Sequence, residues 1–202
     1  MRSITQVVIS LSVALMLPML STQMSRSVTP VKAEGSGVLA SETDSSVSLT
    51  PNFQGAPFIW VESAEAGGYP GYRLVEGGKH TDGTMMYICR VGGTTPGKLY
   101  KNLCHYPMAG GETVVGKYQV LLTNRAYQWL KARNVTRAQI KSEAVKGGVD
   151  EGNQKNPPLY ICRKNMKDGV HPGKYSYNNN LCYIAWGDRE RYFNDGFEIL
   201  FP

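Results

Sequence analysis

The sequence predicts an all-β protein in which two tandem, pseudo-symmetric antiparallel repeats follow an apolar N-terminal segment. Three observations support this prediction. Tyr, Gly and Pro occur 12, 22 and 11 times in 202 residues, a composition that suits short strands and tight turns better than a helix bundle. A set of short motifs recurs in the same order in both halves of the chain. The four Cys occupy equivalent places in the two copies.

Residues 1–33 have the features of a secretory signal peptide. Arg2 precedes an apolar run at 7–20, which is too short for a transmembrane helix. Small residues at Val31-Lys32-Ala33 mark one cleavage point; cleavage nearer Ser21 and an uncleaved anchor are the alternatives. We therefore expect a secreted, periplasmic or extracellular protein, with no integral membrane insertion after signal removal.

The rest of the chain divides into a linker and one domain. Residues 34–56 are rich in Ser, Thr and Gly and predict a flexible linker. Residues 57–202 are predicted to form a single β domain made of repeats 57–123 and 124–202. Length differences between the repeats fall in Gly-, Asn- and Pro-rich segments, where loops accept insertions.

The repeats are defined by six matched motifs. They are Trp60 and Trp129; Gly77-Gly78 and Gly147-Gly148; Tyr87-Ile88-Cys89-Arg90 and Tyr160-Ile161-Cys162-Arg163; Pro96-Gly97-Lys98 and Pro172-Gly173-Lys174; Asn102-Leu103-Cys104 and Asn180-Leu181-Cys182; and Tyr118-Gln119-Val120-Leu121 and Phe197-Glu198-Ile199-Leu200. Aromatic and β-branched residues between turn formers predict a strand at most of these motifs. A fixed order of motifs, interrupted only at loops, indicates duplication of one structural unit.

Two segments need separate interpretation. Residues 97–106 and 173–186 each predict a strand with a turn or bulge at the Asn residues. Residues 124–145 contain helix formers and apolar residues at helical spacing. The repeat places this second segment opposite the Trp60 strand, however, so we predict a strand there.

The cysteines predict disulfides. Cys89, Cys104, Cys162 and Cys182 form an even set behind a signal peptide, and no pair has the Cys-x-x-Cys spacing of a zinc or redox motif. Pairing within each repeat is the simplest connectivity, although four Cys allow three. We expect no metal and no cofactor.

Charge and motifs narrow the classes of function. The formal charge falls from +6 to +3 when residues 1–33, which carry three basic and no acidic residues, are removed. No dense basic run interleaves with aromatics, so no nucleic-acid partner is expected. The chain has no catalytic Ser, zinc-protease or phosphate-loop motif, and every Cys has a repeat partner. We therefore expect a protein that is not an enzyme.

The motifs resemble the DM-nine repeat family over about residues 58–201. The first repeat carries WVESA, GGKHTDG, MYICR, PGKL, AGGE and YQVL in order. The second departs from the pattern, with WGDRE in place of Gly-Gly-Glu and GGVDEGN as its acidic segment. The resemblance implies that the two repeats intertwine about a pseudo-two-fold axis. It also implies binding of mannose-type glycans, because characterised members include mannose-binding lectins.

The resemblance also implies the ligand-binding residues. They are an acidic-loop residue and the Lys of Pro-Gly-Lys: His80 or Asp82 with Lys98, and Asp150 or Glu151 with Lys174. A carboxylate accepts hydroxyl protons and an ammonium donates to hydroxyl oxygens, so such a pair suits vicinal sugar hydroxyls. The aromatic side chains that could cover the apolar face of a sugar are Tyr100, Tyr175, His80 and His171. Two sites per chain, or a homodimer, would raise avidity.

Other interpretations remain open from the sequence. Each Lys could belong to a solvated surface ion pair, and Pro-Gly could recur only because it forms a tight turn. Arg90 and Arg163 suit structural hydrogen bonding as well as ligand contact. The alternatives to a carbohydrate-binding module are a structural or protein-interaction module and a glycan hydrolase.

Overall fold

The computed structural model describes residues 56–149 and 157–202, which lie within one compact unit, Thr50–Pro202. The predicted signal peptide, 1–33, lies outside the described residues, as does all of the predicted linker except Ala56. Within the described ranges, no helix combines the length and the apolar character needed to cross a bilayer.

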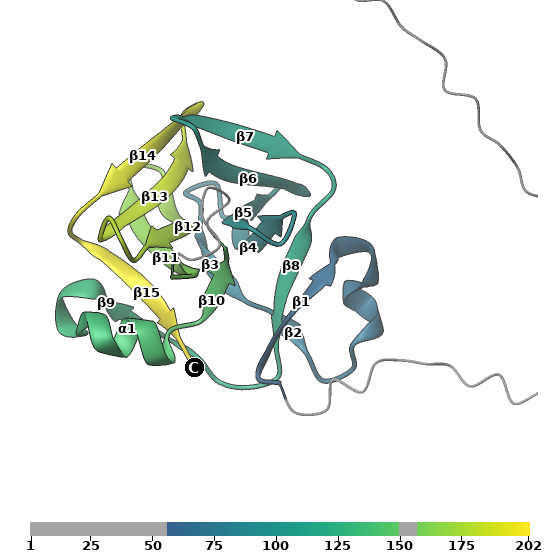
Figure 1. The fold of residues 1–202 in the computed structure, drawn as a ribbon. Helices are drawn as coiled ribbons and strands as arrows, with labels where there is room; N and C mark the ends of the chain where they lie inside the picture. The colour runs from purple at the N-terminus through teal and green to yellow at the C-terminus, as the bar shows by residue number, and fades with distance from the viewer. Residues whose placement is uncertain (1–55, 150–156) are drawn as a thin grey trace, which may run out of the picture. The chain divides into compact units, whose positions relative to one another are not determined.

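The described residues form a curled antiparallel sheet, which confirms the all-β prediction (Figure 1). The strands of the first repeat are β1 (Phe58–Glu62), β2 (Arg73–Leu74), β3 (Glu76–Lys79), β4 (Met85–Val91), β5 (Thr95–Tyr100), β6 (Leu103–Met108), β7 (Gly111–Val115) and β8 (Gln119–Thr123). Those of the second are β9 (Gln128–Lys131), β10 (Lys146–Gly148), β11 (Leu159–Met166), β12 (Gly169–Ser176), β13 (Leu181–Trp186), β14 (Arg189–Phe193) and β15 (Phe197–Phe201).

The order of the strands in the sheet is palindromic with respect to the repeats. The sheet runs β1-β8-β4-β5-β6-β7 and continues β14-β13-β12-β11-β15-β9, with β3 on β4, β10 on β11 and β2 on β8. Each strand of the first series therefore has its repeat counterpart at the mirrored place in the second. The two series join through the pairing of Arg189 with Gly111, where β14 meets β7 (Figure 1). This arrangement places a pseudo-two-fold axis between the repeats.

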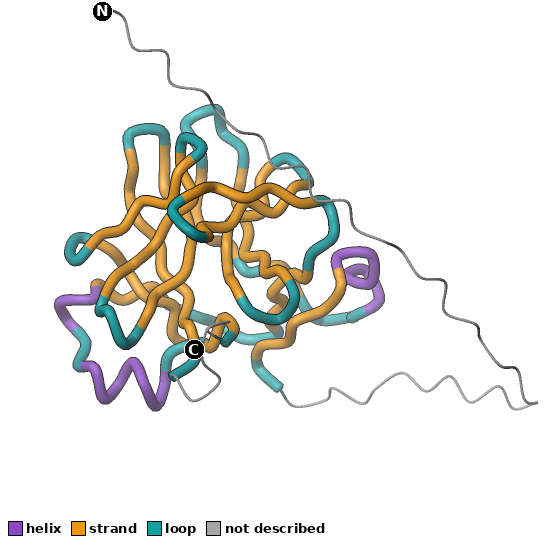
Figure 2. The backbone as a smooth tube through the Cα atoms, turned by 45° about the horizontal axis from the view of Figure 1, so that its top comes forward, coloured by secondary structure: helices purple, strands orange, loops and turns teal. Residues whose placement is uncertain are grey.

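The segment 124–145 is only partly a strand. β9 pairs with β15 as β1 pairs with β8, so the strand predicted opposite Trp60 exists at Gln128–Lys131. The prediction of a strand is wrong for the later residues, which form the 3-10 helix η2 (Ala132–Asn134) and the helix α1 (Arg137–Glu143). Local signals prevail there because Thr136 and Gln139 form a capping box at the start of α1. Both η2 and α1 lie at the edge of the strands. The 3-10 helix η1 (Ser63–Gly68) also lies at an edge (Figure 2).

A central hydrophobic core is shared by the two repeats. Its buried members form pairs from equivalent positions of the two repeats: Val75 with Val145, Ile88 with Ile161, and Leu121 with Leu200. Trp60 and Trp129 pack against this core from equivalent places. Because neither repeat encloses these side chains alone, the two must fold as one unit.

Gly-Gly pairs bring the repeats into close contact. A Cβ at Gly78 would overlap the carbonyl oxygen of Val170, and a Cβ at Gly148 would overlap that of Thr94. Their neighbours Gly77 and Gly147 lie against the rings of Pro172 and Pro96. In each case the glycine of one repeat contacts the other, so the repeats intertwine.

The disulfides connect strands within each repeat. Cys89 bonds to Cys104 and Cys162 bonds to Cys182, which confirms the simplest predicted pairing. The first bridge links β4 with β6, and the second links the equivalent strands β11 and β13. Each closed loop of this size is worth about 3 kcal/mol in the chain-entropy model.

Candidate ligand-binding site

Lys98 lies inside a strand and not after a turn. Pro96 and Gly97 belong to β5, where they pair with Arg90 and Cys89 of β4. The interpretation of Pro-Gly as a tight turn is therefore wrong. Proline is accepted here because β6 pairs with β5 only from Lys98 onward, so no ladder bond is lost. Glycine is required at 97 because a Cβ would overlap the carbonyl oxygen of His105.

The ammonium of Lys98 connects the two repeats. Its Nζ donates to the carbonyl oxygen of Ala185 at 2.7 Å and lies 3.2 Å from Oε1 of Glu112. A third neighbour is Nδ1 of His171, at 3.5 Å. Lys98 is only 6% exposed, so these contacts replace most of its hydration. Such a buried ammonium is held in one place by groups from both halves of the chain.

Glu112 is the acidic partner of Lys98. Its Oε1 is 2.8 Å from Nδ1 of His105, and its Oε2 accepts the backbone N–H of Asp188 at 3.1 Å. Burial alone would raise the pKa of this carboxyl, but the His105 contact and the Lys98 charge lower it to about 2. Glu112 is therefore an anion at neutral pH, with its carboxylate fixed against a buried cation.

Asp168 forms the opposite side of the site. Nε1 of Trp186 donates to its Oδ1 at 2.7 Å, and Nε2 of His171 lies 3.0 Å from the same oxygen without hydrogen-bond geometry. Nε2 of His80 lies 3.4 Å from its Oδ2. Burial opposes ionisation of Asp168, but the Trp186 bond and the two imidazoles lower its pKa overall. Burial and the neighbouring Lys98 charge lower the pKa of His171, which favours the neutral ring.

Asp82 lies in the acidic loop beside this site. Its carboxylate accepts from the backbone N–H of Thr84 at 2.8 Å and from the hydroxyl of Tyr100 at 2.8 Å. These bonds, with the one to Thr84 first, lower its pKa. Oδ1 is also 3.0 Å from Nδ1 of His80, and Lys101 lies 3.7 Å away. Asp82 thus positions His80 and Tyr100, while Lys98 takes Glu112 as its partner.

These groups surround a cavity of about 360 Å³. Its lining residues are His80, Met86, Lys98, Tyr100, His105, Glu112, Val114, Asp168, His171, Trp186, Gly187 and Asp188. All three histidines of the chain are among them. Both repeats contribute, so the site exists only when they are intertwined. We call it the Lys98 cavity.

A second cavity of about 300 Å³ surrounds Lys174. Nζ of Lys174 donates to the carbonyl oxygen of Pro107 at 2.8 Å and lies 3.0 Å from Oε1 of Glu190. Oε2 of Glu190 accepts the N–H of Gly110 at 2.8 Å. This geometry repeats that of Lys98, Glu112 and Asp188, so WGDRE retains the carboxylate although it departs from Gly-Gly-Glu. We call this the Lys174 cavity.

The sequence-predicted residues divide between these places. His80 and Lys98 line one cavity, Lys174 lines the other, and Asp82 supports the first. Asp150 and Glu151 lie outside the described residues. Tyr100 lines the Lys98 cavity, whereas Tyr175, the other Tyr predicted as an aromatic cover, is fully buried and cannot cover a ligand.

Several residues of the cavities were not predicted as ligand-binding residues. They are Glu112, Glu190, His105, Asp168 and Trp186. The Gly-Gly-Glu motif contains Glu112 and was the one available signal for it. Asp168 and Trp186 reach the site from the other repeat, and no local spacing identifies such residues.

Arg90 and Arg163 have structural contacts. The guanidinium of Arg90 lies 4.3 Å from the ring of Trp60, and that of Arg163 lies 4.4 Å from the ring of Trp129. Burial lowers the pKa of Arg90 to about 10, which leaves it charged at neutral pH. The described residues contain no group of three or more His, Cys, Asp or Glu arranged to hold a metal ion.

The fold and the site define a class: an all-β domain of two intertwined repeats, with one Lys–Glu cavity for each repeat. The chain belongs to the DM9 repeat family, whose model matches residues 91–193. A solved structure, the nematode sperm cell motility protein MFP2B, has a similar fold, with a TM-score of 0.53 at 15% identity. The similarity covers 71% of this chain and 46% of that one. No curated protein matches the sequence.

Proposed function

We propose that this chain is a non-catalytic carbohydrate-binding module that holds a sugar in the Lys98 cavity without a metal ion. The observation that carries the proposal is the fixed Lys98–Glu112 pair in an open cavity beside aromatic rings. A volume of about 360 Å³ is at the small end of ligand pockets and suits one or two sugar rings. The family resemblance adds mannose-type glycans as the ligand class.

The hydrogen-bonding capacity of the cavity supports this proposal. The contact of Lys98 with His171 is the longest of its three, so a sugar hydroxyl oxygen can replace it. Oε2 of Glu112 accepts one backbone N–H and has a lone pair left for a hydroxyl proton. Tyr100 and Trp186 offer ring surface to the apolar face of a pyranose. A vicinal diol would thus meet a donor, an acceptor and an aromatic face.

The Lys174 cavity is the proposed second site. It has the same Lys–Glu pair but replaces the histidines and Trp186 by residues such as Thr95, Tyr183 and Met108. We expect it to bind the same class of sugar with a different affinity. Shallow sites of this kind bind weakly singly, and two of them on one chain raise avidity.

We also propose that the protein acts outside the cytosol. Two disulfides within small loops are typical of oxidising compartments. The predicted signal peptide at 1–33 supports the same location. A structural or protein-interaction module is the alternative function, and it would bind its partner whether or not free sugar is present.

Calorimetric titration with mannose and a glycan array test the proposal. We expect saturable binding to at least one sugar, abolished by Lys98→Met in a folded sample. Absence of binding to every sugar by the folded wild-type protein would refute it. A protein partner that is captured equally well with and without excess sugar would favour the alternative.

A further inference from the structure

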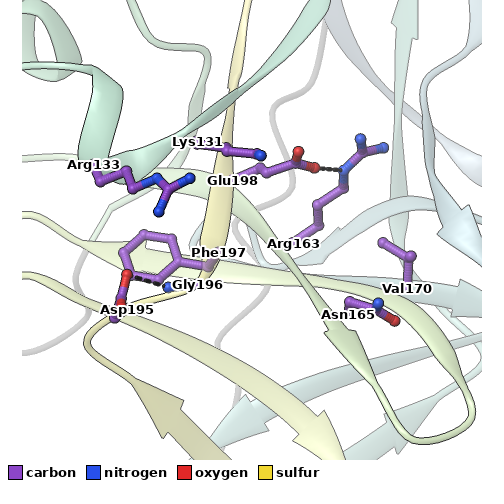
Figure 3. Close-up of a pocket in the computed structure, with 9 residues that line it drawn as sticks. All are labelled: Lys131, Arg133, Arg163, Asn165, Val170, Asp195, Gly196, Phe197 and Glu198. Atoms are coloured by element: carbon purple, nitrogen blue, oxygen red, sulfur yellow. Dashed lines mark hydrogen bonds and ion pairs between the residues drawn. The ribbon is translucent and has the colours of Figure 1, made fainter.

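A cavity of about 430 Å³, distinct from both Lys–Glu cavities, lies where β9 passes into η2 and meets β15 (Figure 3). Three cationic side chains line it: Lys131, Arg133 and Arg163. Its acidic members are Asp195 and Glu198. Figure 3 shows that the side chains of Lys131 and Arg133 lie on the same side of the cavity, above the ring of Phe197.

The two carboxylates already have partners. Nε of Arg163 donates to Oε2 of Glu198 at 2.6 Å, and the same guanidinium lies over Trp129. Asp195 accepts the N–H of Gly196 within its own turn. Lys131 lies opposite Glu198 in the β9–β15 ladder, but the side chains of Lys131 and Arg133 are exposed and form no hydrogen bond or ion pair with any described residue. The cavity thus contains two cationic groups whose charges are not neutralised by close contacts within the described chain.

The first repeat has no such excess of charge at the equivalent place. The positions that match Lys131, Arg133 and Glu198 hold Glu62, Ala64 and Gln119. There, Nε2 of Gln119 donates to Glu62 at 3.0 Å, and Nε of Arg90 donates to Gln119 at 2.7 Å. In the first repeat, the cation Arg90 and the anion Glu62 are thus joined through Gln119, and their charges balance. The cationic cavity is therefore specific to the second repeat and is not required by the fold.

We propose that this cavity binds a phosphate or sulfate ester group through Lys131 and Arg133. A guanidinium and an ammonium that converge on one hollow suit an anion with several oxygens, because the planar Arg donates in a fork and Lys adds a compact charge. Phosphate and sulfate esters each present several terminal oxygens to these donors, whereas a carboxylate presents only two. The site is independent of the proposed sugar binding in the Lys98 cavity.

The test is a titration of the isotopically labelled protein with inorganic phosphate at constant ionic strength, followed by amide chemical shifts. We expect saturable shifts near Arg133, Gly196 and Phe197. Lys131→Glu should weaken binding by about tenfold or more, because a charge-assisted contact is replaced by repulsion. Arg133→Ala, which introduces no repulsive charge, should weaken it in the same direction. Parallel titration with inorganic sulfate shows which of the two inorganic anions the site prefers, and saturable binding of either supports the proposal.

Two controls separate a site from general attraction of anions. Lys117→Glu changes the net charge by the same amount at an exposed turn outside this cavity, and it should leave phosphate binding unchanged. Lys98→Met should abolish sugar binding and leave phosphate binding intact. The proposal is overturned if the shifts do not saturate, if acetate binds as well as phosphate, or if Lys117→Glu weakens binding as much as Lys131→Glu.

Discussion

The ammonium of Lys98 lies 3.2 Å from the carboxylate of Glu112, and both side chains are more than nine-tenths buried. The two residues come from β5 and β7, with β6 between them, so the hairpins of the first repeat bring them together. The carbonyl of Ala185 fixes the ammonium from the second repeat. A buried pair of this kind adds little net stability over an apolar pair, but breaking it leaves a charge without a partner. Comparing a variant that removes one charge with a variant that removes both can therefore separate the structural role of the pair from its role in ligand binding.

Replacing Lys98 alone should destabilise the fold. Lys98→Met leaves the Glu112 carboxylate buried beside His105 without its cation, which should cost about 3 kcal/mol. The double variant Lys98→Met/Glu112→Gln removes both charges and should recover most of that loss. Urea denaturation measures both. Equal stability of the single variant and the wild type would mean that the pair is solvated and carries no buried charge.

The same double variant tests binding. It should remain unable to bind sugar although its stability is restored, because neither the charged donor nor the charged acceptor is present. Calorimetry on the folded double variant measures this. Wild-type affinity in this variant would place the sugar site elsewhere.

Stability should depend on pH through Glu112. Its pKa is lowered from 4.5 to about 2 in the folded protein, so the unfolded chain takes up a proton first as the pH falls. The stabilisation is complete above about pH 5 and is lost as the pH falls towards 2. Denaturation midpoints measured across this range should decline, and Glu112→Gln should reduce the slope. An identical slope in that variant would assign the acid sensitivity to other carboxyls.

The sequence predicts the fold well because duplication leaves local evidence at every element. Cys89, Cys104 and their counterparts recur with the same strand motifs, and the predicted pairing is confirmed. Helix α1 is not predicted because the repeat pattern favours a strand at 124–145, although Thr136 and Gln139 form a capping box at the start of the helix. A duplicated chain can still insert a helix where its repeats differ in length.

The candidate site is predicted less completely, because its residues come together over long distances in sequence. The Pro-Gly-Lys motif identifies Lys98, and the acidic loop identifies His80 and Asp82. The partner of Lys98 is nevertheless Glu112, which approaches through the β6–β7 hairpin. Asp168 and Trp186 enter from the second repeat through the intertwined topology. Their binding roles, like those of the predicted residues, stay predictions.

The intertwining itself can be tested at Gly78. A Cβ there would overlap the carbonyl oxygen of Val170, a backbone atom of the other repeat that cannot move without shifting β12. Gly78→Ala should therefore cost about 3 kcal/mol or more, and Gly148→Ala should behave alike because it meets the carbonyl of Thr94. Thermal and urea denaturation measure the loss.

Gly67 provides the matched control for these substitutions. A Cβ at Gly67 meets nothing within 4 Å, so Gly67→Ala should change stability by no more than about 0.5 kcal/mol. The contrast depends only on contact between the repeats, since none of the three glycines has a positive φ. If Gly78→Ala were as stable as Gly67→Ala, the repeats would not be in close contact at β3. The Lys98 cavity, which needs Asp168 and Ala185 from the second repeat, would then lack one of its walls.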